Sequence, residues 1–260
     1  MSAAGEPGAA ALLEGRQLVR AYDGRTVVDH VDISAAAGQI TAIIGPNGAG
    51  KTTLFNTLAG AERPDRGHVL LNGRDVTHLD SDARARLGLA RTFQQSTVFG
   101  SLTVEENLRV GAESRYHDGT LRGLVGLPDR SSSSAAAIVE QALTDVGLRS
   151  LRHVRAGGLP TGTLRLVELA RALCTQPAAL LLDEPASGLD DSETEELHQL
   201  LHRLAARGLA LLLIEHDLDL VREAADLVYV MAAGQIIASG PHAEVIGRPD
   251  VRAVALGIPT

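Results

Sequence analysis

One glycine-rich stretch constrains this chain more than any other feature. It reads Gly45-Pro46-Asn47-Gly48-Ala49-Gly50-Lys51-Thr52-Thr53. The run matches G-x-x-x-x-G-K-[ST], a loop that cradles phosphate groups between a β-strand and an α-helix. The flanks fit this context, because the apolar run Ile40 to Ile44 predicts a strand before the loop and Thr52 to Ala59 predicts a helix after it. The sequence therefore predicts an α/β fold with a phosphate-binding loop.

The chemistry of the loop follows from its residue types. Gly45, Gly48 and Gly50 allow the backbone to turn tightly and aim its N–H groups at phosphate oxygens. The next helix adds the positive end of its dipole. Lys51, the only lysine in the chain, places a compact ammonium on the β- and γ-phosphates, and the Thr52 hydroxyl can bind Mg²⁺. The loop thus predicts a nucleoside triphosphate and Mg²⁺ as ligands.

Composition limits the classes of partner. The 260 residues are 45% hydrophobic and 22% charged, which suits one large α/β domain. The net charge of −8 argues against nucleic-acid binding and against binding anionic lipid by charge alone. Cys174 is the sole cysteine, so no internal disulfide can form, and buried packing is its expected role. Met1 to Ala11 lacks the apolar core of a signal peptide. No apolar stretch approaches the length of a membrane span, so a protein partner would have to hold the chain at a membrane.

Antiparallel β-structure is predicted on both sides of the loop. Apolar patterns indicate strands over Ala11 to Val19 and Thr26 to Ile33, and Asn-Gly predicts a hairpin over His68 to Val76. Tyr22 lies in the turn between the first two strands. It is either a stacking partner for a nucleotide base or an ordinary hairpin tyrosine.

The sequence predicts that residues 95–174 form a mostly helical insertion. Three segments have helical patterns: Thr103 to Ala112, Ala135 to Val146 and Leu164 to Cys174. Glu113 to Ser134 is rich in glycine and serine, ends in four serines and predicts a loose connection. The expected division is a catalytic core of residues 1–94 and 175–260, with an N-terminal β-subdomain, and a helical subdomain of residues 95–174.

Two short apolar runs later in the chain predict buried parallel strands. The first, Ala179 to Leu182, leads into Asp183-Glu184-Pro185, and the second, Leu209 to Ile214, leads into Glu215-His216-Asp217. A buried carboxylate near phosphates needs a cation, so Asp183 is expected to bind Mg²⁺ through water. Glu184 is expected to orient, or accept a proton from, the attacking water. The alternative for the acidic pair is a helix cap.

Five segments stand in an order that resembles the ATP-binding subunit of ABC transporters along nearly the whole chain. They are the phosphate loop, Gln94, the turn Leu159 to Thr163, the run from Asp183 to Asp190, and His216. Finer features resemble the importers of branched-chain amino acids, although urea importers and lipopolysaccharide exporters share much of them. These features are Leu89 to Gln94, Leu166 to Leu173 and Ile214 to Asp217.

The resemblance implies a P-loop NTPase core, a single ABC ATP-binding domain, ATP as the bound nucleotide, and further site residues. The His216 imidazole would reach the γ-phosphate. Gln94 would sense Mg²⁺ and the γ-phosphate and pass that signal to a membrane partner. The loop ending at Asp190 would cross to the opposite protomer, since two such chains close head-to-tail over two ATP molecules. The implied partners are integral membrane permease subunits, a second ABC ATPase that is identical or a paralogue, and an extracytoplasmic solute-binding protein. The implied location is the cytoplasmic face of a bacterial inner membrane.

The signature turn departs from the family pattern Leu-Ser-Gly-Gly-Gln, because this chain has Leu159-Pro160-Thr161-Gly162-Thr163. Proline cannot supply the hydroxyl of the missing serine. The contact with the opposite nucleotide is therefore expected to come mainly from Gly162 and backbone amides at a helix start near Leu164, helped by a threonine hydroxyl such as that of Thr161. The alternative is that this half-site is degenerate.

Several alternatives remain open from the sequence. His198 and His202 have the i, i+4 spacing of metal ligands, but a solvated polar helix face is the favoured interpretation. For function, the rivals are a soluble ABC ATPase of repair or translation, a nucleotide-dependent switch that barely hydrolyses ATP, and the ATPase of an exporter. The transported solute is not encoded in this chain.

Overall fold

A computed structural model describes residues 11–92, 98–114, 131–215, 218–245, 248 and 251. The strands of the described part are β1 (Ala11–Tyr22), β2 (Arg25–Ala36), β3 (Ile40–Ile44), β4 (Arg66–Leu71), β5 (Arg74–Asp75), β6 (Leu89–Arg91), β7 (Ala179–Asp183), β8 (Ala210–Ile214), β9 (Leu227–Ala232) and β10 (Gln235–Pro241). The α-helices are α1 (Lys51–Ala59), α2 (Ser81–Arg86), α3 (Val104–Ser114), α5 (Ser131–Asp145), α6 (Thr161–Cys174), α7 (Asp191–Ala206), α8 (Leu218–Ala224) and α9 (His242–Val245), with short 3₁₀ turns at Arg149–Leu151 and Ala156–Gly158.

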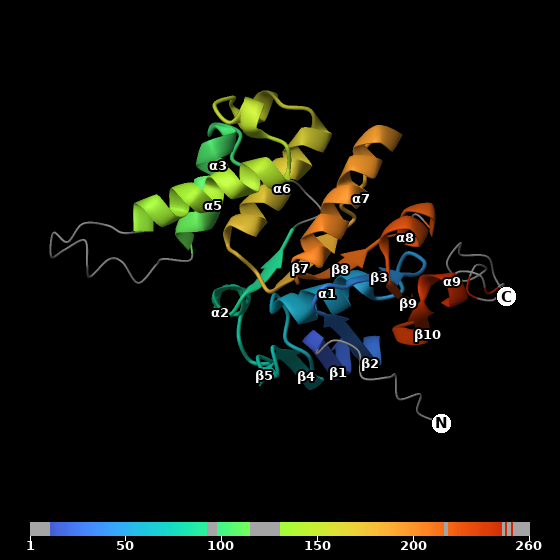
Figure 1. Ribbon diagram of the computed structural model, residues 1–260. Helices are drawn as coiled ribbons and strands as arrows, with labels where there is room; N and C mark the ends of the chain where they lie inside the picture. Colours follow the sequence, from blue (N-terminus) through green and yellow to red (C-terminus); the bar gives the residue numbers. More distant parts are fainter. Residues whose placement is uncertain are drawn as a thin grey trace, which may run out of the picture.

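The strands form two sheets (Figure 1). The smaller sheet has the order β2-β1-β4-β5 and is antiparallel, as the sequence predicted. The larger sheet has the order β10-β9-β3-β8-β7-β6, in which only the edge strand β10 runs antiparallel to its neighbour. Helix α1 contributes Leu54, Phe55 and Leu58 to a core that both sheets share. The phosphate loop therefore leads into a helix that is held between two sheets.

The central strands are buried on both faces, which explains their continuous apolar sequences. In β7, Leu181 belongs to the core shared with α1, whereas Leu180 and Leu182 belong to the core on the helical side. Every residue of β3, β7 and β8 is buried. The carboxyl ends of these strands consequently meet at one edge, where ligands of open α/β sheets bind.

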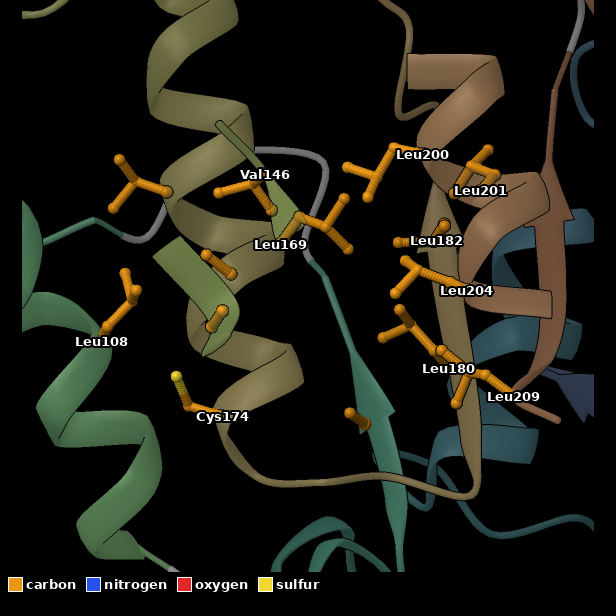
Figure 2. Packing of buried hydrophobic residues seen from close by; sticks show 14 of the residues in the cluster. Leu108, Val146, Leu169, Cys174, Leu180, Leu182, Leu200, Leu201, Leu204 and Leu209 are labelled. Carbon is orange, nitrogen blue, oxygen red and sulfur yellow. The ribbon is translucent and has the colours of Figure 1, made fainter. Parts of the chain in front are cut away.

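The helical segment packs on the sheet through one continuous core. Figure 2 shows Leu108 of α3, Leu169 and Cys174 of α6, Leu180 of β7 and Leu204 of α7 within a single apolar cluster. The expected subdomain boundaries stay a prediction, because this cluster spans the helices and the strands alike. Cys174 is fully buried, as expected, and burial raises the pKa of its thiol to about 12, so the thiol stays protonated.

Two predicted helix boundaries are wrong. Helix α6 begins at Thr161 and not near Leu164, because the Leu164 N–H donates to the Pro160 carbonyl at 3.0 Å. Proline suits this position, since its missing N–H would have had no helical partner. The four serines Ser131 to Ser134 open α5 and do not end a loose connection. Alanine is the strongest helix former, and the run Ala135 to Ala137 directly after the serines favours a helix that includes them. Residues 115–130 lie outside the described part.

Within the described residues, no helix has both the length and the apolar character needed to cross a membrane.

Candidate nucleotide-binding site

The phosphate loop connects β3 to α1 and has the backbone that the motif requires. Gly45 and Gly50 have φ angles of 151° and 103°. A Cβ at Gly45 would lie 2.0 Å from the Met231 carbonyl oxygen, and one at Gly50 would lie 2.3 Å from the Val27 carbonyl oxygen. No side chain at these positions could be accommodated without moving backbone, so both glycines are obligatory.

The first turn of α1 presents free N–H groups at the end of this loop. The earliest helical bond runs from the Leu54 N–H to the Gly50 carbonyl at 2.9 Å, and Gly50 supplies no side-chain cap. No acidic residue occupies the first turn. Thr52 is exposed there and Thr53 is half-buried. A helix end of this kind favours an anion, and phosphate is the anion whose shape fits the loop.

Lys51 is folded back over the loop. Its Nζ donates to the Gly45 carbonyl at 2.6 Å and to the Pro46 carbonyl at 3.0 Å. Burial lowers the pKa of Lys51, while the charges of Glu184 and Asp183 oppose that shift. The lysine therefore lies within electrostatic reach of both strand-end carboxylates.

Asp183 is the last residue of β7 and is only 3% exposed. Burial raises the pKa of its carboxyl group, and the Arg91 guanidinium acts in the opposite direction. Arg91 Nη2 lies 3.3 Å from Asp183 Oδ2, and Arg91 Nη1 donates to Asn56 Oδ1 of α1 at 2.7 Å. Arg91 thus ties β6, α1 and Asp183 together. The sequence pattern pointed to Arg91 only as part of a family motif and did not assign it this role.

Glu184 directly follows Asp183 in a left-handed backbone conformation, with φ of 48°. Its N–H donates to the Ile214 carbonyl of β8 at 3.0 Å, and its carbonyl accepts from Arg165 Nη1 of α6 at 2.8 Å. A non-glycine residue in this region of backbone space is uncommon and frequently marks a functional site. The helix-cap alternative for the Asp-Glu pair is not what the structure shows, since α7 is capped by Asp190 instead.

Thr161 to Thr163, the last three residues of the predicted signature turn, are the first residues of helix α6. Thr161 is exposed in the first turn of α6, whereas Gly162 is buried. A Cβ at Gly162 would lie 2.5 Å from Glu193 Oε1 of α7. An aspartate at Gly162 would therefore meet Glu193 of its own chain, so substitution there cannot report cleanly on a second chain. The contact between Gly162 and an opposite nucleotide stays a prediction, and Thr161 is the accessible residue of the turn.

Two other predicted nucleotide contacts have partners within the chain. Tyr22 ends β1, its hydroxyl bonds to Glu62, and the Arg20 guanidinium lies 4.7 Å from its ring centroid. Tyr22 is still 38% exposed, so base stacking by its ring stays a prediction. Asp190 forms a capping box with Glu193 at the start of α7, accepting from the Glu193 N–H at 2.8 Å. Its expected contact with the opposite protomer is untested.

Gln94 and His216 lie outside the described residues, so their expected roles stay predictions. The neighbouring Glu215 is described and is 1% exposed. Its Oε1 accepts from the Ala186 N–H at 3.3 Å, which joins the end of β8 to the loop after β7. No role was assigned to Glu215 from the sequence. The signal that could have indicated one is its position, because it is an acidic residue directly after the apolar run Leu209 to Ile214.

One of the two histidines on α7 departs from the favoured interpretation of a solvated polar face, whereas His202 is exposed as expected. His198 is only 5% exposed and does not lie on a solvated face, because it faces α8, where Glu223 Oε2 lies 3.5 Å from His198 Nδ1. His198, Glu195 and Glu223 bring ligand atoms within 4.8 Å of one another, and His202 is not part of that group. His198 Nε2 is buried without a hydrogen-bond partner among the described residues. Metal-binding histidines normally donate this second nitrogen to a partner, so the group lacks a feature of a metal site.

Comparison with known proteins identifies the family that shares this arrangement. The family described as "ABC transporter" matches residues 28–187, which include the phosphate loop, Asp183, Glu184 and the signature turn. The chain belongs to the ABC transporter family. It is accordingly an ATP-binding cassette, the ATPase component of such transporters, and the P-loop NTPase fold predicted from the sequence is confirmed.

Similar proteins cover almost the whole chain. The high-affinity branched-chain amino acid transport ATP-binding protein LivG of Escherichia coli is 37% identical over 249 residues, which is 95% of this chain and 98% of that protein. The lipopolysaccharide export system ATP-binding protein LptB of Acidithiobacillus ferridurans is 35% identical over 95% of this chain and 97% of its own length. A crystal structure of the ADP conformation of an ATP-binding cassette has a TM-score of 0.82 and 33% identity, covering 95% of this chain and 99% of its own.

Proposed function

We propose that this ATP-binding cassette energises the import of branched-chain or other hydrophobic amino acids through partner permease subunits. The observation that carries the proposal is a complete phosphate loop, with Asp183 and Glu184 at the adjacent strand end, in a chain similar to LivG over nearly its full length. The protein would act at the cytoplasmic face of the membrane, where permeases offer their intracellular loops.

Each site residue has a distinct task in this proposal. The loop amides and Lys51 hold the β- and γ-phosphates, and Mg²⁺ bound beside Thr52 and Asp183 neutralises charge on the phosphoryl group. Asp183 fits a cation because it is a buried carboxylate at the end of β7, beside the phosphate loop. Glu184 orients the attacking water as a general base. Gln94 and His216 complete the site, and a second ABC subunit brings its signature turn to the opposite side of the nucleotide.

A groove of about 480 Å³ between α2 and β6 on one side and α3 and α6 on the other is the proposed docking site of the permease. Its wall includes Phe99 and Val110, which are 48% and 40% exposed. Exposed apolar residues gathered in one groove indicate a protein partner. Arg91 also lines this groove and contacts Asp183, so the docking site adjoins the nucleotide site. An amphipathic helix from a permease loop is the segment that fits such a groove.

The substitution Phe99→Asp tests the docking site. We expect it to weaken binding of the permease by about 30-fold or more, since it places a charge in an apolar contact. ATP binding by the isolated cassette should be unchanged. Co-purification of the tagged cassette from membranes, with identification of the bound subunits, measures the first effect, and a nucleotide titration measures the second.

Ile237→Asp is the matched control, because Ile237 is 45% exposed but lies on β10, away from the groove. Membrane association that survives Phe99→Asp, or that is lost equally in Ile237→Asp, would rule out the groove as the docking site.

Deleting the gene for this chain tests the substrate. Uptake of labelled leucine by intact cells is expected to fall by about tenfold or more if no second system carries the flux, since the permease alone cannot use ATP. Wild-type chain supplied in trans should restore uptake, and a Glu184→Gln chain should not. Normal leucine uptake together with loss of lipopolysaccharide from the outer surface would instead favour the export function of the LptB relative.

A further inference from the structure

The backbone of Glu184 is held from two sides. Its φ of 48° is a conformation that residues with a side chain rarely adopt, and such a conformation persists only where the surroundings maintain it. On one side, the Glu184 N–H donates to the Ile214 carbonyl of β8. On the other side, its carbonyl accepts from Arg165 Nη1 at 2.8 Å. The second contact comes from a different part of the fold, since Arg165 lies on α6, the helix that begins with the signature turn.

Arg165 directs its guanidinium to a backbone carbonyl and not to an acid. Among the described residues, Arg165 forms a hydrogen bond to the Glu184 carbonyl and no ion pair, and its buried Nε has no hydrogen-bond partner. Arg165 also lines a small cavity with Gly162 and Pro185, directly beside the turn that carries Glu184. Arg165 is thus a partly buried charged side chain that directs its hydrogen bond to one backbone carbonyl. Such a charge-assisted hydrogen bond is suited to fixing the position of that carbonyl.

We propose that Arg165 is a positioning residue that holds the general base Glu184 in its left-handed conformation from the signature helix of the same chain. The role rests on the proposed function of Glu184. It would make the geometry of the base depend on where α6 lies, so movement of α6 would change the alignment of the attacking water without altering the phosphate loop. Arg165 itself touches neither nucleotide nor water in this role.

The first test compares Arg165→Met with Arg165→Lys in purified cassette. Arg165→Met keeps the aliphatic stem but removes the donor, and we expect kcat to fall by about tenfold, the effect of losing one charge-assisted hydrogen bond. The Kd for ATP should stay within about twofold, because Lys51 and the loop are untouched. Arg165→Lys retains a donor and is expected to stay within about threefold of the wild-type kcat. Arg203→Met, an exposed arginine on α7, is the matched control and should be normal.

These readouts separate positioning from ordinary structural support. A residue that merely stabilised the fold would lower the melting temperature and weaken ATP binding along with kcat, and its lysine variant would not recover turnover. A normal kcat in Arg165→Met, or a parallel loss of kcat and ATP affinity, would overturn the proposal.

A double-mutant cycle with Glu184→Gln identifies the residue through which Arg165 acts. If Arg165 acts only through the base, adding Arg165→Met to Glu184→Gln should leave the residual single-turnover rate unchanged within about twofold. An additional tenfold loss in the double variant would contradict the proposal. The Glu184→Gln variant also distinguishes failure of the proposed function of Glu184 from failure of the proposed role of Arg165. Near-normal hydrolysis by Glu184→Gln refutes the base assignment itself, whereas an inactive Glu184→Gln with a normal Arg165→Met refutes only the role of Arg165.

Discussion

Replacing Glu184 with glutamine is expected to lower steady-state ATP turnover by about 10²–10⁴-fold, the usual contribution of a general base. The amide is close in size to the carboxylate, so the backbone bonds to Ile214 and Arg165 are retained. Because Lys51 and the loop are unaltered, the Kd for ATP should change little. Unhydrolysed ATP would then keep the cassettes closed as a dimer, which size-exclusion chromatography in Mg·ATP can detect.

Glu196→Gln provides the control for Glu184→Gln, since it removes the same charge from an exposed position on α7. We expect wild-type turnover and no trapped dimer for this variant. A Glu184→Gln protein that hydrolyses ATP within about threefold of the wild-type rate would show that another group serves as the base.

Replacing Lys51 with arginine is expected to weaken ATP binding by about 100-fold or more, even though the positive charge is kept. The ammonium is compact, and the structure places it 2.6 Å from the Gly45 carbonyl and 3.0 Å from the Pro46 carbonyl. A planar guanidinium cannot enter the same space and still reach two phosphate oxygens. Losing charged hydrogen bonds to phosphate, each worth about 1.5–3 kcal/mol, accounts for the size of the effect.

The measurement is a titration of purified Lys51→Arg with ATP and Mg²⁺. Arg203→Lys makes the converse exchange at an exposed position of α7 and should bind ATP normally. Because every other basic residue of the chain is arginine, apart from histidine, normal ATP affinity in Lys51→Arg would mean that the lone lysine is not required for its geometry.

Local sequence patterns were sufficient for the loop and for the strands that surround it. Strand β3 coincides with the predicted run Ile40 to Ile44, and β7 ends at the predicted Asp183. Short apolar runs between turn residues can be satisfied only by burial on both faces, so few alternatives compete with a central parallel strand. The same local information placed Lys51, Asp183 and Glu184 at one edge of the sheet.

The predicted start of α6 was wrong because its first turn has no strong helical signal. Threonine and glycine are poor helix formers, so Thr161, Gly162 and Thr163 resembled a turn. In the folded chain these residues are helical, and Gly162 packs against Glu193 of α7. This is a contact between separate helices, which the local sequence does not reveal. His198 was misjudged for a similar reason, since its i, i+4 pattern with His202 does not reveal that it faces α8.

The amino-acid sequence thus determined the phosphate loop, the positions of the buried strands along the chain and the identity of the acidic pair, because these depend on neighbouring residues. The order of the strands in the sheet, with β3 between β9 and β8, was decided by tertiary packing. The partners of the site residues were decided by tertiary packing. Arg91 lies 92 positions from Asp183, and Arg165 lies 19 positions from Glu184 on another element. An arginine can reach many carbonyls and carboxylates, and its sequence position carries no information about which of them the packed helices and strands bring within 3 Å or so. Only the folded chain selects them.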